Sequence, residues 1–222
     1  MTPALLIIGS LALPAVGALG ITLADGRPRL RQAAALAAAA LLVACALGLL
    51  PVVWAGSVPQ LFVLEMLPGI ALGFRVEPLG MLFALAASGC WLAITLRSGE
   101  TRHALTTFAA VGIAFAANLA TLVVFGALLT ALRRPRAAGL ALAVALLAVA
   151  LLATWILAGT LEFLPGGILR GTIGAAARAG LLALYVLGLA AWALAPERHW
   201  TRAAAAVFAA LKLVAYVFGA HL

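Results

Sequence analysis

Long apolar runs recur along the whole of this 222-residue chain, and each is about as long as a bilayer crossing. A helix needs ~20 apolar residues to span a hydrocarbon core. Inside that core every backbone N–H and C=O must be paired within the protein, so only helices or a closed barrel can cross. The runs are continuous and rich in Ala and Leu, which favours helices over the alternating pattern of barrel strands. We therefore expect an all-α, polytopic membrane helix bundle without a soluble catalytic domain.

The composition excludes an ordinary soluble domain. Hydrophobic residues make up 67% of the chain and charged residues 9%, and the mean hydropathy is +1.24. Soluble domains contain about 45–50% apolar and about 25% charged residues. The net charge of +8 comes from arginines between apolar runs, where they set topology, so no nucleic-acid partner is expected. Cys45 and Cys90 both fall in apolar runs, which argues against a disulfide framework or a metal site.

We predict about eight transmembrane helices within one transmembrane domain covering residues 1–222. The spans are expected at about 4–24, 34–54, 79–96, 104–117, 119–132, 138–158, 174–194 and 203–221. Between the second and third spans, residues 56–78 contain three prolines and three charges, which indicates an extended excursion on one surface. No positively charged region precedes the first apolar run, so a cleaved signal peptide is not expected.

Loop charges decide whether residues 104–132 form one long helix or two short helices broken near Asn118. With two helices, the loops after the first, third, fifth and seventh spans share one side, and only Arg75 and Arg170 occupy opposite loops. The shared side then holds Arg27, Arg29, Arg31, Arg97, Arg102, Arg133, Arg134, Arg136, Arg198 and Arg202. The positive-inside rule therefore favours eight spans in a bacterial-type inner membrane, with both termini outside the cytoplasm. Two short helices are tolerable only if neighbouring helices bury them.

Lys212 is predicted near the middle of the last span, where a charged group is expensive and therefore a functional candidate. A desolvated lysine can exchange protons near neutral pH, which makes Lys212 a proton-relay candidate. Alternatively, its long stem lets the ammonium snorkel or make a helix-packing contact. Arg178, near the start of the seventh span, is expected to snorkel. The acids map to loops or span ends and are expected to be solvated; they are Asp25, Glu65, Glu77, Glu100, Glu162 and Glu197.

The remaining motifs give little support to a self-contained enzyme. Glu100 with His103, and Glu197 with His199, are too sparse for a metal site, which requires three or four ligands. The chain contains no phosphate-binding loop, dinucleotide fingerprint or nucleophile elbow. No cofactor, metal or catalytic residue is assigned, and membership of a redox-linked, proton-pumping complex stays open.

Several segments together resemble the antiporter-like subunits of respiratory complex I, Mrp-type cation/proton antiporters and membrane-bound hydrogenases. Residues 67–83 are similar to the family's extended segment leading into its third helix, although the family usually has Asp in place of Glu77. Residues 108–129, with Ala-Asn-Leu-Ala-Thr-Leu at 117–122, resemble its fourth and fifth helices. Residues 161–168 resemble the loop after its sixth helix, and residues 188–200 resemble the end of its seventh.

The resemblance also implies what this chain has lost. The family places a glutamate nine residues after the Asn, where this chain has Ala127, and a lysine five residues before the Pro of the seventh helix, where it has Ala191. These two groups form the family's coupled proton-handling pair. Lys212 falls close to a further lysine of the eighth helix in some members. The chain covers the family's N-terminal half and ends where a second repeat is expected, so it is interpreted as a truncated, degenerate member.

We therefore expect an accessory or structural membrane subunit of a proton- or cation-translocating complex, either NADH dehydrogenase-like or Mrp-like. Its partners would be other membrane subunits and the lipid bilayer. The main alternative is an active cation/proton transporter half that a partner subunit or a second copy completes. A third alternative is a membrane-embedded enzyme that uses His103 or His199.

Overall fold

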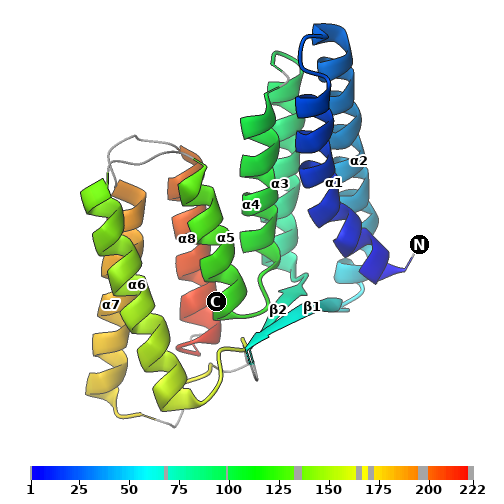
Figure 1. The fold of residues 1–222 in the computed structure, drawn as a ribbon. Coiled ribbons are helices and arrows are strands. Elements are labelled where there is room, and N and C mark those ends of the chain that lie inside the picture. Colours follow the sequence, from blue (N-terminus) through cyan, green and yellow to red (C-terminus); the bar gives the residue numbers. More distant parts are fainter. Residues whose placement is uncertain are drawn as a thin grey trace. The chain divides into compact units, whose positions relative to one another are not determined.

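The computed structural model describes residues 2–67, 70–98, 100–132, 137–163, 167–169, 173–194 and 200–219. This part of the chain forms eight helices and one two-stranded sheet (Figure 1). The helices are α1 (Pro3–Leu23), α2 (Pro28–Trp54), α3 (Pro78–Thr95), α4 (Thr101–Phe115), α5 (Leu119–Ala131), α6 (Ala137–Ala158), α7 (Ala175–Leu194) and α8 (Trp200–Tyr216). The predicted membrane helix bundle with about eight helices is confirmed.

Four of these helices are long and apolar enough to cross a membrane by length and composition, namely α1, α2, α3 and residues 175–193 of α7. Each of α1, α2 and α3 has a proline in its first turn, where the missing N–H would have had no helical partner. The chain is a multi-pass membrane protein.

The chain divides into two compact units. The first contains Met1–Val63, Gly73–Ala116 and Phe125–Leu132, and the second contains Leu64–Leu72, Ala117–Val124 and Arg133–Leu222. The first unit thus holds α1 to α4 and the end of α5, and the second holds the start of α5 with α6, α7 and α8. That residues 1–222 form a single transmembrane domain stays a prediction.

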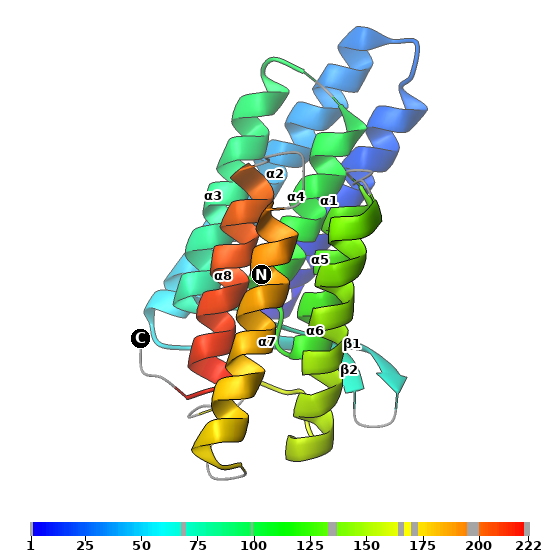
Figure 2. The same ribbon diagram turned by 90° about the vertical axis from the view of Figure 1, so that its left-hand side faces the viewer.

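Helices α1 to α4 of the first unit form a bundle in which α1 packs against α2 and α4, and α3 also packs against both (Figures 1 and 2). Small residues allow the backbones to approach: a Cβ added to Gly17 would lie 2.7 Å from the Cβ of Ala38. Hydroxyl groups in this apolar core bond to carbonyls of the preceding turn, as Ser10 does to Leu6 at 2.8 Å. These hydroxyl groups are thereby satisfied without water.

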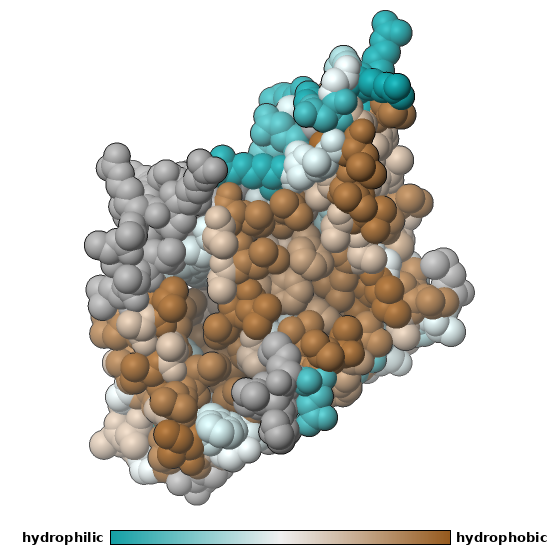
Figure 3. Space-filling model, in the orientation of Figure 1, coloured by the Kyte–Doolittle hydropathy of each residue, from teal (hydrophilic) through white to brown (hydrophobic). Residues whose placement is uncertain are grey.

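One end of this bundle carries hydrophilic loops, whereas apolar side chains cover its flanks (Figure 3). The α1–α2 and α3–α4 connections lie together there, because Gln32 Nε2 donates to the carbonyl of Leu96 at 3.4 Å and Thr22 lies 3.4 Å from Thr101 between hydroxyl oxygens. Arg27, Arg29, Arg97 and Arg102 are exposed in or beside these two connections. The side chains of Arg133, Arg134, Arg136, Arg170, Arg198 and Arg202 lie outside the part that the structure describes, so the charge bias across all eight helices stays a prediction.

The stretch 104–132 forms two short helices rather than one. Helix α4 has 15 residues and α5 has 13, which at ~1.5 Å per residue gives about 22 and 20 Å, less than a hydrocarbon core of about 30 Å. Every residue from 111 to 122 is buried, including the turn between the helices. Burial by the rest of the protein therefore makes the short helices tolerable.

The proline-containing stretch between α2 and α3 forms a hairpin of strands β1 (Gln60–Leu67) and β2 (Ile70–Arg75). The sequence indicated extended chain here but did not predict paired strands. At the base of the hairpin, Phe74 of β2 forms a bridge with Ala116 at the end of α4. Trp54, at the end of α2, is 83% exposed, and exposed tryptophans at the ends of membrane helices are typical of the bilayer interface.

In the second unit, α6 packs on α7, and α7 packs on α8. A Cβ added to Gly188 of α7 would lie 2.9 Å from side-chain atoms of Leu147, so α7 needs a small residue there. The loop after α6 returns to the end of α8, because Ile168 N–H donates to Tyr216 O at 2.9 Å and Leu169 N–H donates to Val217 O at 3.0 Å. Gly167 adopts φ 94° where a Cβ would lie 2.5 Å from the backbone nitrogen of Gly219.

Two glycines of α3 provide a matched test of this packing. A Cβ at Gly80 would lie 2.5 Å from the carbonyl oxygen of Ala114, which is backbone and cannot rotate away, whereas nothing lies within 4 Å of a Cβ at Gly89. We expect Gly80→Ala to destabilise the protein by about 1–3 kcal/mol and Gly89→Ala to be neutral or stabilising by up to ~1 kcal/mol. Reversible unfolding in mixed micelles measures both, and equal effects would contradict the α3–α4 contact.

Candidate functional site around Lys212

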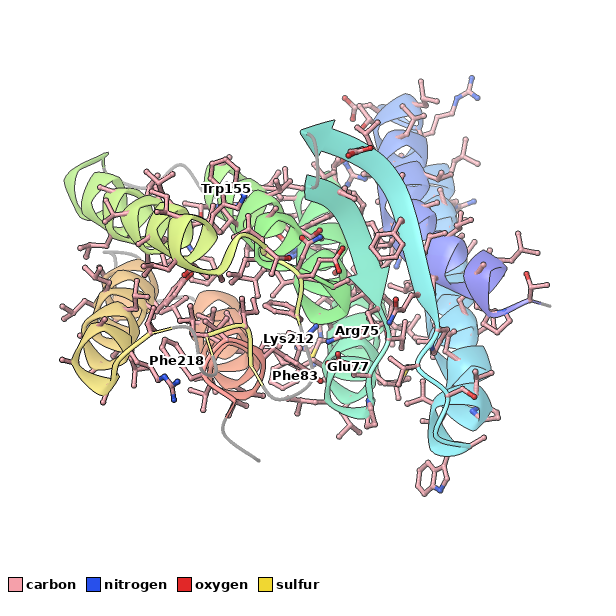
Figure 4. The ribbon with its side chains drawn as sticks, turned by 90° about the horizontal axis from the view of Figure 1, so that it is seen from below. Arg75, Glu77, Phe83, Trp155, Lys212 and Phe218 are labelled. Carbon is pink, nitrogen blue, oxygen red and sulfur yellow. The ribbon has the colours of Figure 1, made fainter. Side chains whose placement is uncertain are left out.

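Lys212 lies within α8, and its side chain is 1% exposed (Figure 4). Helix α8 brings it to the interior because the adjoining buried residues Phe208, Ala209 and Leu213 occupy the same side at helical spacing. A snorkelling lysine would place its ammonium at the surface, which the observed burial disfavours. The proton-relay role stays a prediction.

Two aromatic rings surround the Lys212 ammonium. Its Nζ lies 5.5 Å from the ring centroid of Phe208 and 5.6 Å from that of Phe163. The Phe163 ring is stacked on Tyr216, with centroids 5.5 Å apart. A cation over a desolvated ring gains about 2 kcal/mol, which offsets part of the cost of removing the charge from water. The two rings thus contribute to the stability of the buried ammonium.

Phe163 is positioned by backbone pairing with the α4–α5 turn. Leu119 N–H donates to Leu161 O at 3.0 Å, and Phe163 N–H donates to Ala117 O at 3.1 Å. Asn118, between them, caps α5: its Oδ1 accepts a hydrogen bond from Thr121 N–H at 2.8 Å. Its Nδ2 donates to the carbonyl of Ala71 at 2.6 Å. The helix break occurs where Asn118 indicated it, and the amide has a structural role.

In the first unit, Arg75 and Glu77 form a buried ion pair at the start of α3, with Nε and Oε1 2.5 Å apart (Figure 4). The residues are 9% and 5% exposed, respectively. Glu77 was expected to be a solvated interface group. That prediction is wrong, because Glu77 is buried together with Arg75 and forms an ion pair with it. Asp25, Glu65, Glu100 and Glu162 are exposed, as expected, and Glu197 lies outside the described residues.

The other residues singled out in the sequence do not gather into a site. Ala127 is exposed on α5, and Ala191 is half-buried on α7. His103 lies 3.5 Å from Glu100 at an exposed helix start, and His199 falls outside the described residues. Within the described part of the chain, no group of His, Cys, Asp and Glu could hold a metal ion. Arg178, which was expected to snorkel, donates a hydrogen bond to Leu169 O at 3.0 Å.

A second buried polar cluster, which the sequence analysis missed, joins α6 to α7. Thr154 and Tyr185 place their hydroxyl oxygens 2.8 Å apart, and both reach the carbonyl of Ala150, at 2.8 and 3.2 Å. The only sequence signal for this cluster is the presence of polar Thr154 and Tyr185 within apolar helices. The shared carbonyl fixes the register of the two helices.

The fold is shared with chains of three membrane assemblies. The Mrp complex from Dietzia sp. DQ12-45-1b matches with a TM-score of 0.77 and 19% identity over 98% of this chain and 50% of that chain. The membrane-bound sulfane sulfur reductase, an archaeal respiratory membrane complex, matches with a TM-score of 0.72 and 12% identity over 96% of this chain and 41% of that chain. Respiratory complex I from Thermus thermophilus, with bound aureothin, matches with a TM-score of 0.64 and 22% identity over 91% of this chain and 52% of that chain.

These matches confirm the predicted antiporter-like membrane fold. The chain spans about half the length of the chains that it matches. The sequence itself matches no family model and no curated protein. At these identities the likeness is one of fold.

The buried ion pair gives a second prediction. Removing one charge of a buried pair leaves the other poorly compensated, which costs about 3 kcal/mol. We expect Glu77→Gln to lower the free energy of unfolding by this amount. Glu162→Gln, the same change at an exposed acid, is expected to stay within about 0.5 kcal/mol of the wild type. Reversible unfolding of both variants measures this difference. A Glu77→Gln variant with the same free energy of unfolding as the wild type would contradict the buried ion pair.

Proposed function

We propose that the chain is an accessory or structural membrane subunit of a proton- or cation-translocating complex, NADH dehydrogenase-like or Mrp-like. The proposal rests on one combined observation: a fold shared with chains of the Mrp complex and respiratory complex I, and alanine at both positions where the resemblance implies the proton-handling pair. The methyl groups of Ala127 and Ala191 cannot accept or release a proton.

Apart from Lys212, which is considered below, the buried polar groups Thr154, Tyr185 and Glu77 do not replace that pair. Thr154 and Tyr185 bond to each other and to a backbone carbonyl, and hydroxyl groups of these types release protons only far above neutral pH. Glu77 is engaged with Arg75. Under this proposal a partner subunit supplies the ionisable groups of the proton path, and this chain supplies packing surface.

The proposed location is a bacterial-type inner membrane with both termini outside the cytoplasm. The arginines of the α1–α2 and α3–α4 connections support it, because loops rich in arginine are retained on the cytoplasmic side. Exposed apolar side chains on α6 and α7, such as Val149, Trp155 and Leu187, suit lipid or a neighbouring membrane subunit.

The alternative, an active transporter half completed by a partner or a second copy, is favoured by Lys212. Its burial between Phe163 and Phe208 is the environment in which a lysine can exchange protons. Under this alternative Lys212 carries the ion-coupled step, and under the main proposal it does not.

Native mass spectrometry of the tagged chain, gently extracted from its own membranes, tests the main proposal. We expect the chain to appear in a hetero-oligomer with large multi-helix subunits. A lone monomer or a homo-oligomer would exclude the accessory function.

Flux through the intact complex separates the two candidate functions. We expect Lys212→Ala and Lys212→Arg to leave proton or cation flux in reconstituted vesicles unchanged. A relay lysine would behave differently: both variants would lose about a hundredfold or more, because arginine keeps the charge but does not release its proton. Such a loss in an intact complex would favour the transporter alternative.

A further inference from the structure

The extended segment Leu161–Phe163, which follows α6, makes contacts on two sides within the second unit. Towards the α4–α5 turn it forms two backbone hydrogen bonds, Leu119 N–H to Leu161 O at 3.0 Å and Phe163 N–H to Ala117 O at 3.1 Å. Its side chains alternate, with Leu161 and Phe163 buried and Glu162 exposed. This alternation is that of a strand, so the inward side of the segment is fixed by the pairing.

On its inward side the segment presents Phe163 to Lys212. The ring is 2% exposed, stacks on Tyr216 and lies 5.6 Å from the Lys212 Nζ. The ring is attached to the backbone through a single methylene group, so a shift of the backbone at Phe163 displaces the ring. The attraction between a cation and a ring is confined to about 6 Å, so a displacement of the segment changes what surrounds the ammonium.

On the other side of the turn, Asn118 extends the same connection to the hairpin. Its Nδ2 donates to the carbonyl of Ala71 at 2.6 Å, while its Oδ1 holds the first turn of α5 through Thr121 N–H at 2.8 Å. Leu64 and Glu65 of the hairpin are exposed. A continuous set of hydrogen bonds and ring contacts thus runs from Ala71 of β2, through the turn and the segment, to a buried lysine.

From these contacts we infer that Phe163 is a positioning residue for Lys212, and that the Leu161–Phe163 segment couples the α4–α5 turn to the lysine. When the segment is paired with the turn, the face of Phe163 holds the ammonium away from water. When the pairing opens, the ring moves and Lys212 gains water. By thermodynamic reciprocity, the charge on Lys212 also stabilises the pairing. The inference goes beyond the proposed function, because the coupling exists whether or not the chain moves ions.

Amide hydrogen exchange on the full chain in lipid nanodiscs tests the coupling in one direction. Lys212→Met keeps a long apolar stem but removes the charge. We expect exchange in peptides covering residues 117–121 and 161–163 to become about fivefold faster or more, because the ring loses its cation. Lys212→Arg keeps a cation over the ring and is expected to restore near-wild-type exchange.

Two outcomes of this experiment overturn the inference. Unchanged exchange at both peptides in Lys212→Met shows that the charge does not stabilise the pairing. Faster exchange in both Lys212→Met and Lys212→Arg shows a packing effect of side-chain shape instead of a coupling to charge. Phe208→Leu is the matched control, because it removes a ring at the same distance from Lys212 but on α8 itself; exchange at Leu119 should not change.

The effect of the turn on Lys212 is measured by the rate at which an acylating reagent modifies the Lys212 amine. Mass spectrometry identifies the modified residue. Asn118→Ala loosens the turn, and Phe163→Leu removes the ring, so we expect each to raise the acylation rate several-fold. Asn118→Asp, which keeps an oxygen for Thr121 but loses the donor to Ala71, serves where Asn118→Ala fails to fold. Thr154→Val alters a buried bond of α6 and α7 in the same unit and should leave the rate unchanged. Equal rates in all variants would overturn the inference without bearing on assembly or flux.

Discussion

Backbone groups at the break between α4 and α5 are buried, and the segments that pair with them determine the architecture around the break. A buried amide without a partner is strongly unfavourable in a medium without water. Leu119 bonds to Leu161, Phe163 bonds to Ala117, and the side chain of Asn118 bonds to Thr121. These backbone hydrogen bonds therefore hold the loop after α6 next to the turn, and they position Phe163.

Buried charged side chains occur in both units of the described chain. Arg75 and Glu77 compensate each other directly, and their proximity follows from a separation of two residues in an extended segment. Lys212 lies between rings that come from its own helix and from the loop after α6. An ion pair fixes a local geometry, whereas a ring contact between distant segments makes the surroundings of the charge depend on the tertiary structure.

The sequence predicted the helices well because the length of apolar runs and the charges between them are local signals. Asn118 marked the break, and the distribution of arginines selected two helices over one. The hairpin, the burial of Glu77 and the ring of Phe163 against Lys212 were not predicted. The first two depend on how a proline-containing stretch packs, and the third joins residues far apart in sequence. A single sequence carries no signal for such contacts, although it did single out Lys212 as a candidate functional residue.

A purely structural function leaves the chemistry of Lys212 to be explained. Met or Leu at the same position would pack on the neighbours of α8 without removing a charged group from water. The positions that the resemblance assigns to proton handling hold Ala127 and Ala191, so Lys212 has no counterpart at either of them. A charge that stabilises the pairing between the loop after α6 and the α4–α5 turn gives the lysine a role that needs no ion flux. The accessory function and the buried lysine are then compatible, because the charge acts on the fold of the second unit rather than on a transported ion.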